Sequence, residues 1–330
     1  MTDALFLTSE AVDDLATPAD YVAAVRDGYR EVGEGAPAEP RTLLPSGDPP
    51  GMLTTYVAML PEVGAMGGYT YAAGFAERDA WFLTPLFDAE TGEPLAVIDG
   101  ASMNPFKTGA AGAVAVDALA RPDASTVAVI GSGPQARGQL RTTATVRDLT
   151  GVRVFSPTPA NRESFADEFA ERLDADVTAV SSAGAALADA DVVITATTAS
   201  EPVIADADVE PGTHVTAMGQ YAADKHELPP ELVARATYVP DLTARATRDA
   251  GSFIAAREAG LVTDDDLEVE LGDVVAGSHP GRTSDDEVTV FDSGGTGIET
   301  VAAAHMLYER AREAGRGTPL SIAPASEALT

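Results

Sequence analysis

The sequence of 330 residues contains no cysteine and only two lysines, Lys107 and Lys225. The absence of cysteine excludes disulfides, thiolate nucleophiles and cysteine-ligated zinc. No apolar run reaches about 18 residues, so we expect no membrane-spanning helix. No basic segment lies near residue 1, so we expect no secretory signal and a cytoplasmic location. His226, His279 and His305 have no partner at metal-ligand spacing and His214 is expected to be packed at a strand entrance, so we predict no metal site.

Positive charge is also scarce. Aspartate and glutamate number 52 against 21 lysines and arginines, which gives a formal net charge of −31. The acids are scattered along the chain, and a solvated acidic surface with few lysines suits high salt, where charges are strongly screened. We interpret this surface as an adaptation to a salt-rich cytoplasm. Because the same charge repels phosphates, we expect no nucleic-acid partner.

A buried strand, a tight glycine turn and a helix are predicted in succession over residues 126–139. In the pattern Gly-x-Gly-x-x-Ala, the first glycine allows the turn, the second admits a pyrophosphate to the backbone, and the alanine lets helix and strand pack closely. A proline fits the first helical turn, and free N–H groups there attract phosphates. The alternative is a glycine turn of another α/β domain. The predicted dinucleotide-binding turn consists of Gly131, Ser132, Gly133, Pro134, Gln135 and Ala136.

The chain is expected to fold as an α/β protein with two domains. Residues 119–298 alternate strands and helices, which predicts a Rossmann domain with a doubly wound parallel sheet. Residues 1–118 predict an N-terminal α/β domain, completed by a C-terminal helix within 299–330. Its predicted strands are 5–7, 52–60, 68–73, 80–87 and 94–98, followed by an alanine-rich helix over 107–120.

The second Rossmann strand, 152–155, indicates which nicotinamide cofactor is bound. NAD enzymes usually carry an acid at the end of this strand. Here Ser156, Thr158 and Arg162 follow, and they could hold a 2′-phosphate, so we favour NADP(H) over NAD(H). The alternative for Arg162 is a surface charge beside Glu163. The predicted cofactor site also includes Thr197, Met218 and Gly219.

Several motifs in order along the chain resemble the ornithine cyclodeaminase/μ-crystallin family, which includes an archaeal alanine dehydrogenase. They lie at 88–100, 131–136, 211–219, 270–282 and 290–300. The resemblance implies a homodimer whose N-terminal domain forms the dimer and binds the substrate. It also implies hydride transfer between nicotinamide and the Cα of an amino, imino or keto acid that carries a carboxylate. By resemblance, Ser293, Gly294 and Gly295 belong to the cofactor site near the nicotinamide ring, and the alternative is a flexible loop.

Four residues occupy the positions at which the family holds its substrate. By resemblance, Arg41 and Lys107 converge on the substrate carboxylate, whereas Tyr69 and Tyr221 replace the family's lysine and aspartate. We hypothesise that one tyrosine donates a proton as hydride reaches carbon, with its pKa lowered by the Lys107 ammonium. The alternatives are that both tyrosines only pack and hydrogen-bond, and that Arg41 forms a surface ion pair.

The resemblance leaves three functions open. Because Tyr221 stands where deamination needs a carboxylate, we favour an oxidoreductase of the alanine dehydrogenase or ketimine reductase type. Ornithine cyclodeamination, an ammonia-lyase reaction, is the first alternative. A non-catalytic, NADP-dependent small-molecule binder is the second, because the replaced polar positions fit a lost activity.

Overall fold

The computed structural model describes residues 2–75 and 79–328 of the chain. The chain groups into two compact units, Met1–Lys107 with Thr296–Thr330, and Thr108–Gly295. The domain boundaries predicted from the sequence, after residues 118 and 298, stay predictions. Among the described residues, no helix is both long enough and apolar enough to cross a membrane.

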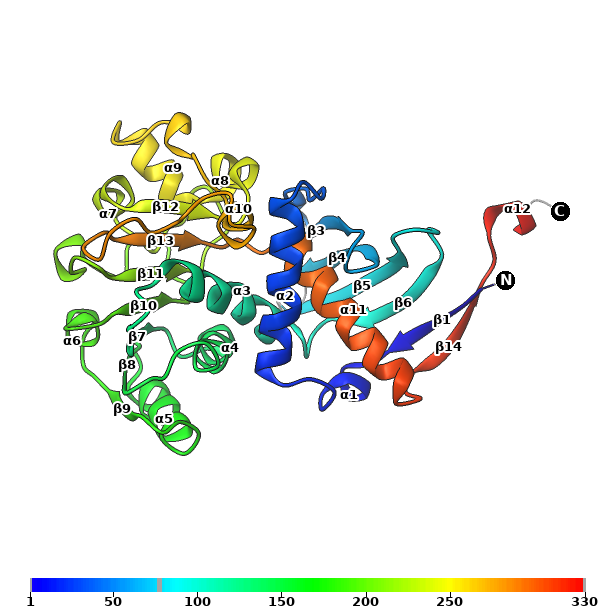
Figure 1. The fold of residues 1–330 in the computed structure, drawn as a ribbon, viewed down its shortest axis with the longest axis horizontal. Helices are drawn as coiled ribbons and strands as arrows, with labels where there is room; N and C mark the ends of the chain where they lie inside the picture. Colours follow the sequence, from blue (N-terminus) through cyan, green and yellow to red (C-terminus); the bar gives the residue numbers. More distant parts are fainter. Residues whose placement is uncertain (1, 76–78, 329–330) are drawn as a thin grey trace. The chain divides into compact units, whose positions relative to one another are not determined.

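The first unit contains a mixed seven-stranded sheet with the order β14-β1-β6-β5-β4-β3-β2 (Figure 1). β1 runs parallel to β6 and antiparallel to β14, and the other neighbours are antiparallel. The five strands predicted from the sequence are present, and β2 and β14 were not predicted. The strands are β1 (Thr2–Leu7), β2 (Thr42–Gly47), β3 (Pro50–Leu60), β4 (Ala65–Ala73), β5 (Ala80–Asp88), β6 (Pro94–Asp99) and β14 (Thr318–Ile322).

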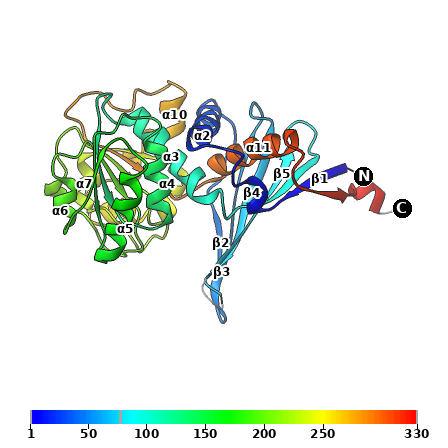
Figure 2. The same cartoon turned by 90° about the horizontal axis from the view of Figure 1, so that it is seen from below.

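Helices cover one face of this sheet. α2 (Pro18–Gly33) begins at a capping box formed by Thr17 and Asp20. α11 (Gly297–Glu313) packs along α2 and across β3, β4 and β5 (Figure 2). Because side chains alternate along a strand, every second residue of β3 is buried beneath the helices and the others are exposed on the opposite face. Short helices α1 (Ser9–Val12) and α12 (Ala325–Ala328) complete the unit.

The second unit contains an all-parallel seven-stranded sheet with the order β12-β13-β11-β10-β7-β8-β9. The prediction of a doubly wound parallel sheet is confirmed. Its strands are β7 (Thr126–Ile130), β8 (Gly151–Phe155), β9 (Asp176–Ala179), β10 (Val192–Thr195), β11 (His214–Ala217), β12 (Thr237–Pro240) and β13 (Thr289–Asp292). Its helices are α3 (Asn104–Leu119, which begins in the first unit), α4 (Pro134–Thr143), α5 (Pro159–Ala170), α6 (Ala183–Leu187), α7 (Pro230–Arg235), α8 (Thr243–Asp249), α9 (Gly251–Glu258) and α10 (Leu271–Val275).

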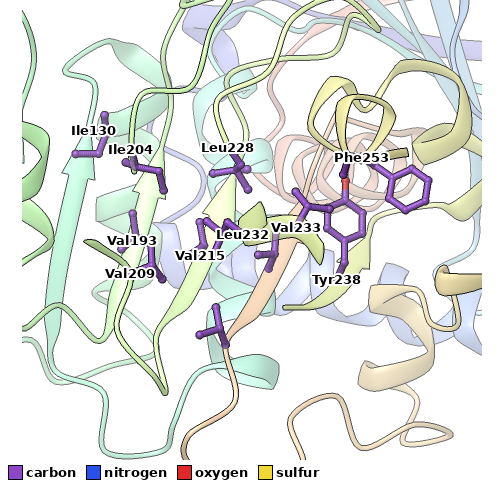
Figure 3. Close-up of a cluster of buried hydrophobic side chains, with 14 of the residues drawn as sticks. Ile130, Val193, Ile204, Val209, Val215, Leu228, Leu232, Val233, Tyr238 and Phe253 are labelled. Atoms are coloured by element: carbon purple, nitrogen blue, oxygen red, sulfur yellow. The ribbon is translucent and has the colours of Figure 1, made fainter. Parts of the chain in front are cut away.

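The core of the second unit lies on both faces of its sheet. Side chains of β7, β10 and β11, such as Ile130, Val193 and Val215, form one cluster that also includes Leu232 of α7 and Phe253 of α9 (Figure 3). A second cluster on the other face joins Val129 and Val154 to Phe165 and Phe169 of α5. The strands read as short apolar runs because both of their faces are buried.

His214 is packed inside this sheet. Its side chain is fully buried, and its Nδ1 and Nε2 lie 2.9 and 3.1 Å from the hydroxyls of Thr289 and Thr216. Burial, reinforced by the charges of Arg282 and Arg147, lowers the pKa of His214 to about 3. The histidine is therefore neutral at physiological pH.

Acid is expected to destabilise the protein through His214. Between the ordinary pKa of 6.5 and about 3, the unfolded chain binds a proton that the folded protein does not. The free energy of unfolding should therefore fall by up to about 1.4 kcal/mol per pH unit as pH drops through this window. Urea unfolding at pH 5 and 7 should show a smaller pH-dependent loss in His214→Gln than in wild type. An equal loss of stability in wild type and His214→Gln would contradict the assignment. His226→Gln serves as the control for the substitution itself.

Candidate active site

The glycine turn follows β7 as predicted. Gly131 has φ +119°, and a Cβ there would collide with the carbonyl oxygen of Ala196, so the position requires glycine. Gly133 is the N-cap of α4, so no side chain caps the N–H groups of this helix. A Cβ at Gly133 would point into open space. Pro134 lies in the first helical turn, and Ala136 is fully buried. Exposed N–H groups at a helix N-terminus beside open space fit a pyrophosphate.

The end of β8 lies beside this turn. The Ser132 hydroxyl is 3.0 Å from that of Ser156, and Gly131 N donates to the Phe155 carbonyl over 2.9 Å. Arg162 of α5 donates through Nη1 to the Ser156 carbonyl over 2.9 Å, and its guanidinium lies 5.9 Å from the centre of the Phe155 ring. Arg162 is therefore held at the strand end, and Thr158 is the exposed N-cap of the same helix.

Thr197, Met218 and Gly219 follow the carboxyl ends of β10 and β11, and one carboxylate bonds both Thr197 and Gly219. The buried side chain of Glu227 accepts hydrogen bonds from Thr195 Oγ1, Thr197 N and Gly219 N at 3.0, 2.7 and 2.7 Å. Burial raises the pKa of Glu227, although the three hydrogen bonds act in the opposite direction and lower it. Glu227 was not predicted as a site residue, although it lies only eight residues after Gly219, the last residue of the matched motif 211–219.

The loop Ser293–Gly295 follows β13 and is held by a buried charge network. Gly294 N donates to Asp241 over 2.8 Å, and Arg245 is ion-paired with Asp241, Asp249 and Asp292. Arg245 is fully buried. The Ser293 hydroxyl is buried and has no hydrogen-bond partner among the described residues, which leaves it available for a ligand. Arg245 was not predicted, and only the spacing Asp241-x-x-x-Arg245 could have suggested it.

In the first unit, Arg41, Tyr69 and Lys107 lie together around Tyr56. The guanidinium of Arg41 is 5.5 Å from the centre of the Tyr56 ring, and Lys107 Nζ is 5.7 Å from the same centre and 4.6 Å from that of Tyr69. Arg41 is 3% exposed, so it is not a surface ion pair. We call Arg41, Tyr56, Tyr69, Lys107 and Glu299 the lysine–tyrosine cluster.

Tyr56 and Glu299 are the members of this cluster that were not predicted, and Glu299 is the charged one. Its Oε1 lies 3.5 Å from Lys107 Nζ, and both side chains are 1% exposed. Glu299 is the third residue of α11, where its oxygens accept from Thr296 N over 2.7 Å and Thr296 Oγ1 over 2.5 Å. The Thr-x-x-Glu capping box was visible in the sequence, but a cap gives no sign that its carboxylate also meets a lysine.

The expected lowering of the Tyr69 pKa is wrong. Burial, reinforced by Tyr71, Glu299 and Asp99, raises the pKa of Tyr69. Lys107 lies over the face of the ring, whereas the hydroxyl donates to the Gly100 carbonyl over 3.4 Å. The phenolate is therefore not favoured at this position.

Tyr221 belongs to the second unit, on the loop after β11, where it is 38% exposed. Its predicted role stays a prediction. Among residues 2–75 and 79–328, no three acidic or histidine side chains gather where they could hold a metal ion. The absence of a metal site also stays a prediction.

The fold and these residues define a two-domain α/β enzyme with a Rossmann nucleotide-binding unit. Residues 2–315 match the ornithine cyclodeaminase/mu-crystallin family. The chain belongs to this family, as its motifs predicted. Its relatives include oxidoreductases that act on imino and amino acids.

Three of these relatives illustrate the similarity. The Δ1-pyrroline-2-carboxylate reductase of Bacillus cereus is 36% identical over 233 residues, which cover 70% of this chain and 71% of the reductase. The Thermococcus litoralis Δ1-pyrroline-2-carboxylate reductase, solved with NADH and L-proline, has a TM-score of 0.90 at 30% identity and covers 96% of this chain and 100% of its own. An archaeal alanine dehydrogenase dimer with bound NAD has the same TM-score and identity, with coverages of 98% and 100%.

Proposed function

We propose that this protein is a nicotinamide-dependent oxidoreductase that reduces the C=N bond of a small imino acid, or oxidises the matching amino acid. The observation that carries this proposal is the lysine–tyrosine cluster, where two buried cations lie among aromatic rings. The glycine turn of the second unit, with its open backbone at Gly133, supports the cofactor class. The relatives that reduce pyrroline-2-carboxylate support the substrate class.

Arg41 is the residue that binds the substrate carboxylate. Its planar guanidinium can donate two parallel hydrogen bonds to a carboxylate, and a lysine can offer only a point charge. The faces of Tyr56 and Tyr69 shield the neighbouring cations from water. When bound, the reduced nicotinamide would supply the hydride that reaches the imine carbon.

Consumption of NADH or NADPH with Δ1-pyrroline-2-carboxylate, or with pyruvate plus ammonia, tests the proposed reaction. Arg41→Leu is expected to raise KM for the acid by about 10²-fold, because a charge-assisted pair is lost, and to leave KM for the cofactor unchanged. Arg257→Leu, which removes a partly exposed arginine, serves as the control. Ammonia release from ornithine without net cofactor consumption would instead indicate a cyclodeaminase, and cofactor binding without turnover would indicate a binder.

Within this reaction we propose a preference for NADP(H). The end of β8 carries no acid, and Arg162 is held there by the Ser156 carbonyl. A guanidinium at this place would pair with a 2′-phosphate. NADPH is expected to bind at least about 10-fold more tightly than NADH, and Arg162→Met should remove most of that difference. Equal affinities in wild type, measured at one fixed salt concentration, would contradict the preference.

We also propose a homodimer formed through the first unit. The sheet face opposite α2 and α11 exposes large apolar side chains, which in a monomer would remain in water. The archaeal alanine dehydrogenase, a relative with the same fold, is a dimer. Light scattering should give twice the chain mass, and a monomer that still turns over substrate would contradict the proposal. The exposed residues are Leu44, Leu53, Val57, Met59, Trp81 and Leu83.

A further inference from the structure

Lys107 is one of two lysines in the chain, and it is enclosed. Its ammonium has Glu299 at 3.5 Å on one side and the Tyr69 and Tyr56 rings at 4.6 and 5.7 Å on others. The other lysine, Lys225, is exposed. A cation that already has a carboxylate partner is a poor receptor for a second carboxylate, because the two acids repel each other. With the substrate carboxylate assigned to Arg41 by the proposed function, Lys107 is considered for another task.

We propose that Lys107 donates the proton of the reduction, and that Glu299 is a positioning residue that holds its ammonium in place. This inference rests on the proposed function. As hydride adds to the imine carbon, the π pair of the C=N bond moves to nitrogen. The nitrogen takes a proton from Lys107 Nζ, which becomes a neutral amine and later regains a proton from water. In the reverse direction, neutral Lys107 accepts the proton from the amino acid.

Tyr69 is less suited to this role. Its hydroxyl is directed to the Gly100 carbonyl, and its raised pKa makes it a weak acid. Burial and the charge of Arg41 act on Lys107 in the useful direction, since they lower its pKa from that of a free lysine. Glu299 opposes them and raises the pKa of Lys107, but burial has the larger effect and makes the ammonium more acidic than that of a free lysine.

Glu299 is held rigidly enough to position a partner. Both carboxylate oxygens are fixed by Thr296 at the start of α11. The helix start cannot shift toward the sheet, because even a Cβ at Gly297 would collide with the backbone of Val57 and Ala58. The charged and titratable groups that face Lys107 are Arg41 before β2, Tyr56 of β3, Tyr69 of β4 and Glu299 of α11, and Tyr71 and Asp99 act on Tyr69 behind them.

NMR of protein labelled with ¹³C at lysine Cε tests the pair without any turnover. Only two signals are expected, and Lys225→Arg assigns them. Lys107 should titrate below the ordinary lysine pKa of 10.5. Glu299→Gln should lower the Lys107 midpoint by a further ~1 pH unit or more, because an opposite charge is removed. A Lys107 midpoint that ignores Glu299→Gln would overturn the positioning role.

The donor role is tested by kinetics on the imino acid that the wild type reduces. Lys107→Arg keeps the charge but provides no usable acid, so kcat should fall by about 10²- to 10⁴-fold with NADPH affinity unchanged. Methylamine should restore part of the turnover of Lys107→Ala. Glu299→Gln should shift the alkaline fall of kcat to lower pH, in step with the NMR midpoint.

Two outcomes separate the failures. If Lys107→Arg keeps kcat and raises only KM for the acid, Lys107 is a carboxylate ligand, and the donor role is overturned while the proposed function stands. If the wild type reduces none of the imino or keto acids, the proposed function and the donor role both fail. The NMR titration would then still decide whether Glu299 positions Lys107.

Discussion

Replacing Gly133 by aspartate is expected to abolish binding of NADPH without unfolding the protein. Gly133 is the N-cap of α4 in ordinary extended conformation, and the space around its Cβ position is open. Aspartate is a preferred N-cap residue, so the helix should lose no stability. The new carboxylate would occupy the place that the pyrophosphate needs and would repel it, which should weaken binding by at least about 10²-fold. NADPH fluorescence and a thermal melt measure the two effects.

Gly133→Asn separates charge from bulk, because asparagine has the same shape and is an equally good N-cap. It should bind NADPH better than Gly133→Asp and worse than wild type. Gly131→Ala provides the opposite case, since its φ of +119° and the Ala196 carbonyl should make it destabilising even without cofactor. Wild-type affinity in Gly133→Asp would remove this turn from the cofactor site.

The largest loss of stability is expected from Arg245→Met. Arg245 is fully buried and pairs with Asp241, Asp249 and Asp292. Removing the cation leaves buried carboxylates uncompensated, which typically costs about 3–5 kcal/mol. Burial already raises the pKa of Asp292, so protonation at mildly acidic pH should restore part of the loss. Denaturant unfolding at pH 5 and 7 measures both effects.

Arg257→Met is the matched control for this substitution. Arg257 pairs with Asp264 over 2.7 Å, but both side chains are partly exposed to water. Such a pair contributes less than about 1 kcal/mol. If Arg245→Met lost no more stability than Arg257→Met, the buried network would not be what holds the Ser293–Gly295 loop.

The sequence predicted the central strands of both sheets and missed two at the edges. The strands of the second unit are apolar runs because they are buried on both faces, and β3 alternates because one face is covered. β2 and β14 are mostly exposed, and each contains a proline. Edge strands of this kind carry little hydrophobic pattern, since one side of their backbone has no partner to pack against.

The candidate site was predictable where one short segment forms it. Gly131–Ala136 could be recognised because strand, turn and helix are consecutive. The pairing of Lys107 with Glu299 could not, because 192 residues separate them. The effect of Lys107 on Tyr69 was misjudged because proximity alone does not say whether a cation meets the hydroxyl or the ring face. Desolvation, which decides the direction of that pKa, is also invisible before the chain is folded.

The first unit is assembled from two distant parts of the chain, and this sets an order of events during synthesis. On the ribosome, residues 108–295 emerge before α11 and β14. Synthesis of this stretch takes about 10 to 40 seconds at usual rates of translation. During that interval α11 does not yet cover Tyr56 and Tyr69, and the ion pair between Lys107 and Glu299 has not formed. The second unit can therefore fold before α11 covers the sheet of the first unit. The emergence of α11, rather than that of the strands before it, completes the lysine–tyrosine cluster.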